Sequence, residues 1–91
     1  MAVEVRIPTV FRKFTGGSAT AEGQPGTLGS LIDELGERFP GFREQVMTGE
    51  GTLHRYVNVY INDEDARYLG QLESPVADGD TVSLLPSVAG G

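Results

Sequence analysis

The most restrictive feature of the sequence is a single amphipathic segment between residues 27 and 39. Its apolar residues have the spacing of one face of an α-helix: Leu28, Leu31, Ile32, Leu35 and Phe39. Thr27 can cap this helix, because its hydroxyl can accept a hydrogen bond from a free backbone N–H. Pro40 and Gly41 end it, since proline disfavours the helical conformation in the residue before it. We therefore expect one helix whose apolar face needs a second layer.

Alternating apolar residues predict the strands of that layer. Residues 3–7, 56–61 and 81–85 alternate clearly, and residues 18–23 form a weaker strand after a Gly16-Gly17 turn. An acidic turn at 62–65 leads to a short stretch at 66–69, which we expect to be a short strand, and residues 42–47 add one helical turn. Gly79 can take a positive φ in the turn before the last strand. The predicted fold class is α+β: a mixed sheet of four to five strands packed on one helix, with its other face open to solvent.

Composition narrows the classes of partner. The chain has 91 residues, no cysteine and a formal net charge of −6. This length suits one domain, and the lack of cysteine excludes disulfides, thiolate metal sites and a cysteine nucleophile. The negative charge disfavours nucleic acid and anionic membranes and suits a basic protein surface. No apolar run approaches the about 18 residues of a membrane span, and no leader is present, so we expect a cytoplasmic protein.

Residue types that are common in catalytic and metal sites do not combine in this sequence. His54 is the single histidine, and it lacks the companions that a zinc or nucleophilic site requires. Asp63, Glu64 and Asp65 do not have the spacing of a calcium loop, and acidic residues between strands are usual in turns. We expect a structural role for His54 and a solvated turn for the three acids. The sequence therefore predicts no metal ligand and no catalytic residue.

Two apolar side chains, Leu85 and Tyr60, fall on solvent-facing positions of their predicted strands. A polar residue is the default at such positions. The pair indicates either a contact patch for a partner or incidental exposure, and the pattern alone does not separate these.

The end of the chain, "LLPSVAGG", combines small side chains with a terminal carboxylate. We predict a domain over residues 1–85 and a flexible tail over residues 86–91, because Pro86 cannot donate to a strand ladder. The side chains decrease from valine to glycine, which suits a narrow channel in another protein. A carboxylate must be activated before it reacts as an electrophile, and glycine has no Cβ to obstruct that reaction. Small residues also gather at termini without a function, so both interpretations stay open.

Three segments carry a resemblance to a known family: "IPTVFRKFTGG", "LHRYVNVYINDEDARYL" and "ADGDTVSLLPSVAGG". Together they resemble the bacterial sulfur carriers of the ThiS/MoaD group, and within it the carriers that serve cysteine synthesis in actinobacteria. The resemblance implies a β-grasp (ubiquitin-like) fold with the first and last strands adjacent and parallel. It also implies that an adenylyltransferase related to ubiquitin-activating enzymes uses ATP to adenylate Gly91. Sulfur then replaces AMP and leaves a thiocarboxylate.

The same resemblance assigns roles to the tail and to the partners. Gly90 completes the motif, Val88 and Ala89 thread the partner's channel, and the docking candidates are Leu85, Pro86, Phe11 and Tyr60. A pyridoxal-phosphate cysteine synthase supplies the sulfur acceptor, and a JAMM-type zinc metalloprotease releases cysteine. ATP, zinc and pyridoxal phosphate therefore belong to the partners, and the chain is a co-substrate, not an enzyme, that we expect to be a monomer when free.

Other functions remain compatible with these residues. A change of acceptor would make the chain a small subunit of molybdopterin synthase or a sulfur donor for thiazole or a natural product. A ubiquitin-like protein modifier would instead form an isopeptide through the Gly-Gly end. A β-grasp interaction module with an incidental tail is the third possibility.

Overall fold

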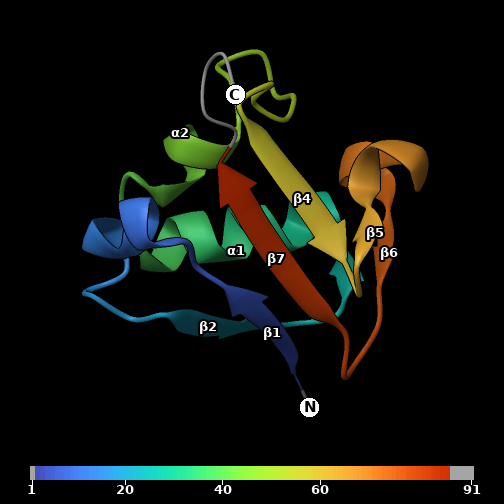
Figure 1. Ribbon diagram of the computed structural model, residues 1–91, viewed down its shortest axis with the longest axis horizontal. Coiled ribbons are helices and arrows are strands. Elements are labelled where there is room, and N and C mark those ends of the chain that lie inside the picture. The colour runs from blue at the N-terminus through green and yellow to red at the C-terminus, as the bar shows by residue number, and fades with distance from the viewer. Residues whose placement is uncertain (1, 87–91) are drawn as a thin grey trace.

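A five-stranded mixed sheet forms the centre of the molecule in the computed structural model, which describes residues 2–86 (Figure 1). The strand order is β2-β1-β7-β4-β5, with β1 and β7 parallel and the other neighbours antiparallel. The strands are β1 (Val3–Arg6), β2 (Thr20–Gly23), β4 (Val57–Ile61), β5 (Glu64–Asp65) and β7 (Thr81–Pro86). The expected adjacency of the first and last strands is confirmed. A separate pair, which the sequence analysis did not predict, joins β3 (Gly26–Thr27) to β6 (Pro75–Val76).

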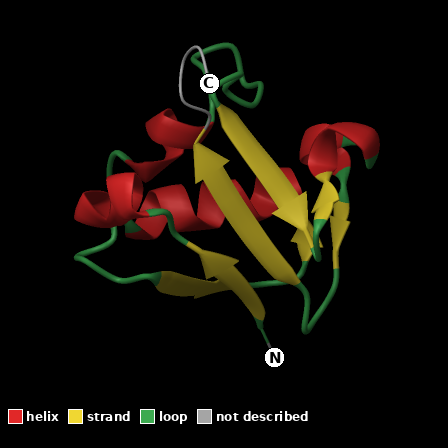
Figure 2. Cartoon of the chain, viewed as in Figure 1, coloured by secondary structure: helices red, strands yellow, loops and turns green. Residues whose placement is uncertain are grey.

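Helix α1 (Leu28–Arg38) lies across one face of this sheet, and Figure 2 shows it behind the strands. The predicted cap is confirmed, because the Ser30 backbone N–H donates to the Thr27 hydroxyl at 3.1 Å. The Ser30 hydroxyl in turn accepts from the Thr27 backbone N–H at 3.1 Å, which completes a capping box. The helix ends before Phe39, as Pro40 requires. Gly41, at φ 92°, then allows the predicted extra turn, α2 (Phe42–Val46).

The core lies between α1 and the sheet. The inward positions of β1, β4 and β7 face the apolar stripe of the helix, and all of these side chains are buried: Val3, Val5, Val57, Val59, Ile61, Val82, Leu84, Leu28, Leu31, Ile32 and Leu35. Burying a side chain of this size contributes about 1.5–3 kcal/mol before the loss of conformational entropy. The strand residues that repeat at every second position therefore pack against the helix residues that repeat every 3.6 positions, as the sequence predicted.

The segments between the strands contain the main differences between the observed structure and the elements predicted from the sequence. Asn62 and Asp63 adopt left-handed φ angles of 51° and 73°, so β5 begins at Glu64. The predicted strand at 66–69 is wrong: this stretch is the 3-10 helix η2 (Ala66–Tyr68), and Ala66 turns into the core. The short strand exists but lies two residues earlier. Two further 3-10 helices, η1 (Thr9–Phe14) and η3 (Gln71–Glu73), occupy segments in which we predicted no helix.

Candidate functional site

The last strand, β7, has two different faces. Val82 and Leu84 are buried, whereas Leu85 keeps 49% of its surface exposed, so the predicted outward orientation of Leu85 is confirmed. Asn58 of β4 lies opposite Leu85, and Tyr60 lies opposite Ser83, two positions along. Leu85 and Tyr60 are therefore diagonal neighbours on the face of the sheet that α1 does not cover.

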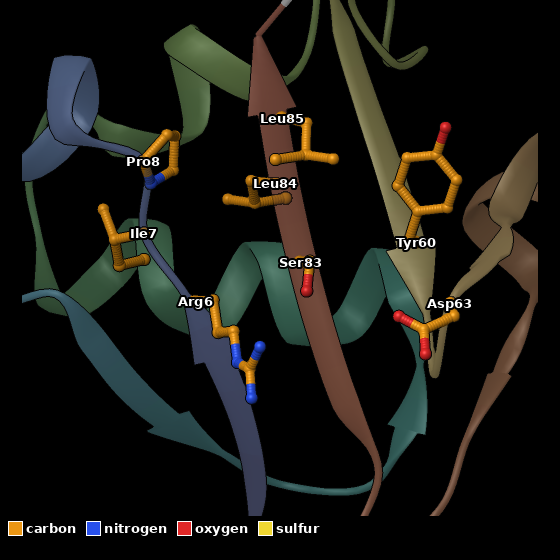
Figure 3. Close-up of a pocket in the computed structure, with 8 residues that line it drawn as sticks. All are labelled: Arg6, Ile7, Pro8, Tyr60, Asp63, Ser83, Leu84 and Leu85. Carbon is orange, nitrogen blue, oxygen red and sulfur yellow. The ribbon is translucent and has the colours of Figure 1, made fainter.

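These two side chains line the same groove, of about 390 Å³, on the open face of β1, β7 and β4 (Figure 3). We call it the Leu85 groove; its lining residues are Arg6, Ile7, Pro8, Tyr60, Asp63, Ser83, Leu84 and Leu85. Figure 3 shows Pro8, Leu85 and the Tyr60 ring toward the carboxyl end of β7, and Arg6 and Asp63 toward its amino end. One end of the groove is thus apolar and the other is charged. The structure joins Leu85 and Tyr60 into one surface, which residue spacing alone did not establish.

The charged end continues into a second depression of about 200 Å³. It shares Arg6, Asp63 and Ser83 with the Leu85 groove and extends to Asn62 and Thr81. We call this continuation the Asp63 depression. Arg6 is already paired within the chain, since its Nε lies 3.3 Å from Glu4 Oε2.

Phe11, a further docking candidate, lies elsewhere. Helix η1 turns its ring inward, so that Phe11 is 8% exposed and belongs to the core. Its accessible edge lines a different depression, of about 240 Å³, together with Tyr56 and Pro86. Phe11 therefore does not line the Leu85 groove, but it shares its depression with Pro86, the residue that follows Leu85.

The tail motif, Val88, Ala89, Gly90 and Gly91, lies outside the described residues. Pro86 is the last residue described, and it is exposed at the end of β7, opposite Val57 of β4. The described domain therefore brings the chain to the edge of the Leu85 groove, with five residues of sequence still to follow.

Comparison with known proteins identifies the family. The model of the ThiS family matches residues 5–91, which is most of the chain. The chain belongs to the ThiS family. It is 46% identical over 93 residues to the sulfur carrier protein CysO of Mycobacterium tuberculosis, and the match covers all of both chains. The predicted resemblance is therefore confirmed at the level of the family and of its CysO-like members.

Two solved structures of similar proteins confirm the fold. A chain in the crystal structure of the Amycolatopsis orientalis BexX/CysO complex is 47% identical, covers 99% of this chain and all of its own, and superposes with a TM-score of 0.92. Small archaeal modifier protein 1 of Haloferax volcanii is 26% identical, with full coverage of both chains and a TM-score of 0.79. The β-grasp architecture predicted from the resemblance is that of these ubiquitin-like proteins.

His54, the single histidine, makes contacts within the fold. The His54 backbone N–H donates to the Val46 carbonyl at 2.8 Å, and its ring centroid lies 6.2 Å from that of Tyr56. Within residues 2–86, no group of three histidine or acidic side chains is placed to hold a metal ion. In that same range, no helix has the length and apolar character needed to cross a membrane.

The sequence analysis missed several groove residues, and Asp63 is the one whose role it assigned differently. We interpreted Asp63 as part of a solvated turn, and it is exposed in a turn, but it also lines both the Leu85 groove and the Asp63 depression. No local pattern could place it there, because its position depends on the pairing of β4 with β7. The one available signal was the Asn-Asp pair between two strands, which predicts a tight hairpin turn.

Proposed function

We propose that this protein is a sulfur carrier whose Gly91 carboxylate is adenylated and then converted to a thiocarboxylate that supplies sulfur for cysteine synthesis. The observation that carries this proposal is the full-length match, at 46% identity, to a protein named as a sulfur carrier. The Gly-Gly sequence at residues 90–91 supplies the reactive end. On this proposal the chain works in the cytoplasm as a co-substrate of its partner enzymes.

The chemistry requires two substitutions at one carbonyl carbon. The Gly91 carboxylate attacks the α-phosphate of ATP, pyrophosphate leaves, and a mixed anhydride with AMP forms. A sulfur nucleophile then forms a carbon–sulfur bond while the carbon–oxygen bond to AMP breaks. Glycine suits both steps because it has no Cβ to obstruct the approach to the carbonyl. ATP, zinc and pyridoxal phosphate act in the partners, and the chain itself needs none of them bound.

The Leu85 groove is the surface that we assign to docking of the adenylyltransferase. It is partly apolar, it lies on the face left uncovered by α1, and its Leu85 wall directly precedes Pro86. Five residues follow Pro86 and can span at most roughly 17 Å, so an enzyme that holds Gly91 in its active site must also approach the end of β7. The similar chain in the BexX/CysO structure is described as part of a complex, which supports recognition by a partner protein.

Two further enzymes complete the proposed cycle. A pyridoxal-phosphate cysteine synthase supplies the acceptor for the thiocarboxylate sulfur, and a JAMM-type zinc metalloprotease then regenerates the Gly-Gly end. Co-purification with such a synthase, and failure to co-purify with a large subunit of molybdopterin synthase, is the expected result. The reverse result would assign the carrier to molybdopterin synthesis instead.

Intact-mass measurement tests the proposal directly. The protein is incubated with the adenylyltransferase, ATP and a sulfide source, and we expect a mass increase equal to one oxygen-to-sulfur exchange. A variant extended by one residue after Gly91 should keep the same Tm and show no increase, because its terminal carboxylate is displaced from the reacting position. An unchanged mass of the natural chain, with an enzyme shown to convert another carrier, would refute the carrier function.

A protein modifier is the second candidate, favoured by the full-length likeness to small archaeal modifier protein 1. In that case activated Gly91 would form an isopeptide bond with a lysine of another protein. Conjugates that survive a denaturing gel and disappear when Gly91 is deleted would support this function. Thiocarboxylate formation without such conjugates would support the carrier.

A further inference from the structure

Asp63 stands at a backbone position that favours glycine. It is the second residue of the two-residue turn between β4 and β5, and its φ of 73° lies in the left-handed region. Aspartate tolerates this region better than most residues, but glycine adopts it without a steric penalty. An aspartate in place of the glycine that suits this turn therefore suggests a role for its carboxylate.

Hydrogen bonds also hold the β4–β5 turn in position. The Asn62 side chain donates from Nδ2 to Asp80 Oδ1 at 2.8 Å, and its Oδ1 accepts from the Thr81 backbone N–H at 2.9 Å. The Asn62 backbone N–H donates to the Thr81 carbonyl at 2.8 Å. These three bonds join the hairpin to the start of β7, so the carboxylate beside the groove is held by a rigid element and not by a long loop.

This end of the groove carries one cation and one carboxylate, Arg6 and Asp63. In the part of the chain that the structure describes, the Asp63 carboxylate has no hydrogen bond or ion pair, whereas Arg6, across Ser83, is paired with Glu4. The chain as a whole carries a net charge of −6. A cationic group is therefore the complement that the Asp63 depression offers to a partner.

Resting on the proposed function, we infer that the Leu85 groove and the Asp63 depression bind one continuous segment of the adenylating enzyme. An apolar side chain of that segment lies against Leu85 and Tyr60, and an arginine or lysine farther along it pairs with Asp63. The order of the two anchors follows from the groove, whose apolar end is nearest Pro86 and whose charged end, with Asp63, is farthest from it. Asp63 is thus a specificity-determining residue, which distinguishes partners with a correctly placed cation from others.

Three variants test this inference in the mass assay for thiocarboxylate formation. Asp63→Asn removes the charge and keeps a residue that tolerates the left-handed conformation. Asp63→Gly removes the charge and relieves the backbone, so its Tm should be unchanged or higher. Asp78→Asn removes one charge from an exposed turn residue outside both the groove and the depression, and serves as the matched control.

We expect both Asp63 variants to raise the KM of the adenylyltransferase for the carrier by about three- to tenfold, with kcat unchanged, because a rim charge acts on encounter and docking. The KM of the natural chain should also increase more steeply with salt than that of Asp63→Asn. Asp78→Asn should stay within about twofold of the natural chain, as expected for loss of overall charge alone. If Asp63→Gly raises the KM while its Tm is not lowered, misfolding is excluded as the cause of the weaker docking.

Each remaining outcome is decisive. Equal effects of Asp63→Asn and Asp78→Asn, or a normal KM in both Asp63 variants, would overturn the inference and leave the carrier function intact. No thiocarboxylate on the natural chain, with an enzyme active on another carrier, would overturn the proposed function and the inference with it. Self-association that sedimentation detects in the natural chain and not in Asp63→Asn would instead assign the groove to a second copy of the chain.

Discussion

The two faces of β7 differ sharply in their exposure to solvent. Val82 and Leu84 are 1% and 3% exposed and belong to the core, whereas Leu85, one residue farther along, is 49% exposed on the open face. The strand gives all three the same backbone, so only their alternation separates them. The inward residues stabilise the fold, and Leu85 is exposed on the open face. Adjacent leucines of one strand therefore have different surroundings.

The strongest way to test this comparison is Leu84→Ala. Loss of a buried leucine side chain leaves a cavity in the core, and we expect the free energy of unfolding to fall by about 3 kcal/mol. Leu85→Ala is the matched variant, and it should change stability by less than about 1 kcal/mol because Leu85 is half exposed. Urea unfolding measures both. Equal losses would mean that the two faces do not differ as described.

Asn62→Ala tests how much the side-chain hydrogen bonds of the β4–β5 turn contribute to stability. The substitution removes two side-chain hydrogen bonds that join the β4–β5 turn to Asp80 and Thr81, and it places alanine at a φ of 51°. We expect a loss of about 2 kcal/mol from these effects together. Asn62→Gly separates them, since it loses the same bonds but tolerates the angle. If both variants lose equally little, the turn is not held by these bonds.

Much of the fold could be predicted from the sequence because its signals are local and repeated. The stripe from Leu28 to Phe39 predicted α1 within one residue of its end, and the hydroxyl of Thr27 predicted its cap. Alternation predicted which of Leu84 and Leu85 faces the core. The parallel pairing of β1 with β7 involves residues far apart in the chain, and only the resemblance to a family supplied it.

The candidate site was less predictable, for two physical reasons. Alternation orients a side chain only within a regular strand, so it said nothing about Phe11, which lies in a 3-10 helix and turns inward. A groove depends on which strands are neighbours, so Arg6, Ser83 and Asp63 could not be grouped before the order of β1, β7 and β4 was known. The short strand was placed at 66–69 because the left-handed Asn62-Asp63 turn, which starts β5 earlier, was not recognised.

Leu85→Arg tests whether the open face of β7 affects docking without affecting stability. A charged side chain in the Leu85 groove should oppose docking of an apolar partner group and raise the KM for thiocarboxylate formation about tenfold, equivalent to about 1.4 kcal/mol. Thermal stability should change little, because Leu85 already faces solvent. Val10→Arg is the control, as Val10 is 56% exposed and lies outside the groove. A loss of stability as large as the loss of docking would place Leu85 in the core.

Asp80→Asn gives the smallest expected effect and tests the start of β7. The Ala77 backbone N–H, at 2.8 Å, and the Asn62 side chain, also at 2.8 Å, donate to the Asp80 carboxylate and hold its pKa below its ordinary value of 3.8. The folded state therefore binds this proton less readily than the unfolded state. The resulting stabilisation is present above pH 3.8 and is lost as the pH falls below that value through the folded pKa.

Substitution by asparagine should therefore lower stability at pH 6 by less than about 1 kcal/mol, because the carboxylate is at the surface and water screens its interactions. The difference between the natural chain and the variant should shrink as the pH falls below 3.8. Urea unfolding at a series of pH values measures it, with Asp78→Asn as the control for loss of one charge. A difference that stays constant down to pH 2 would show that the hydrogen bonds to Asp80 do not depend on its charge, and that the start of β7 is fixed by Asn62 and the backbone alone.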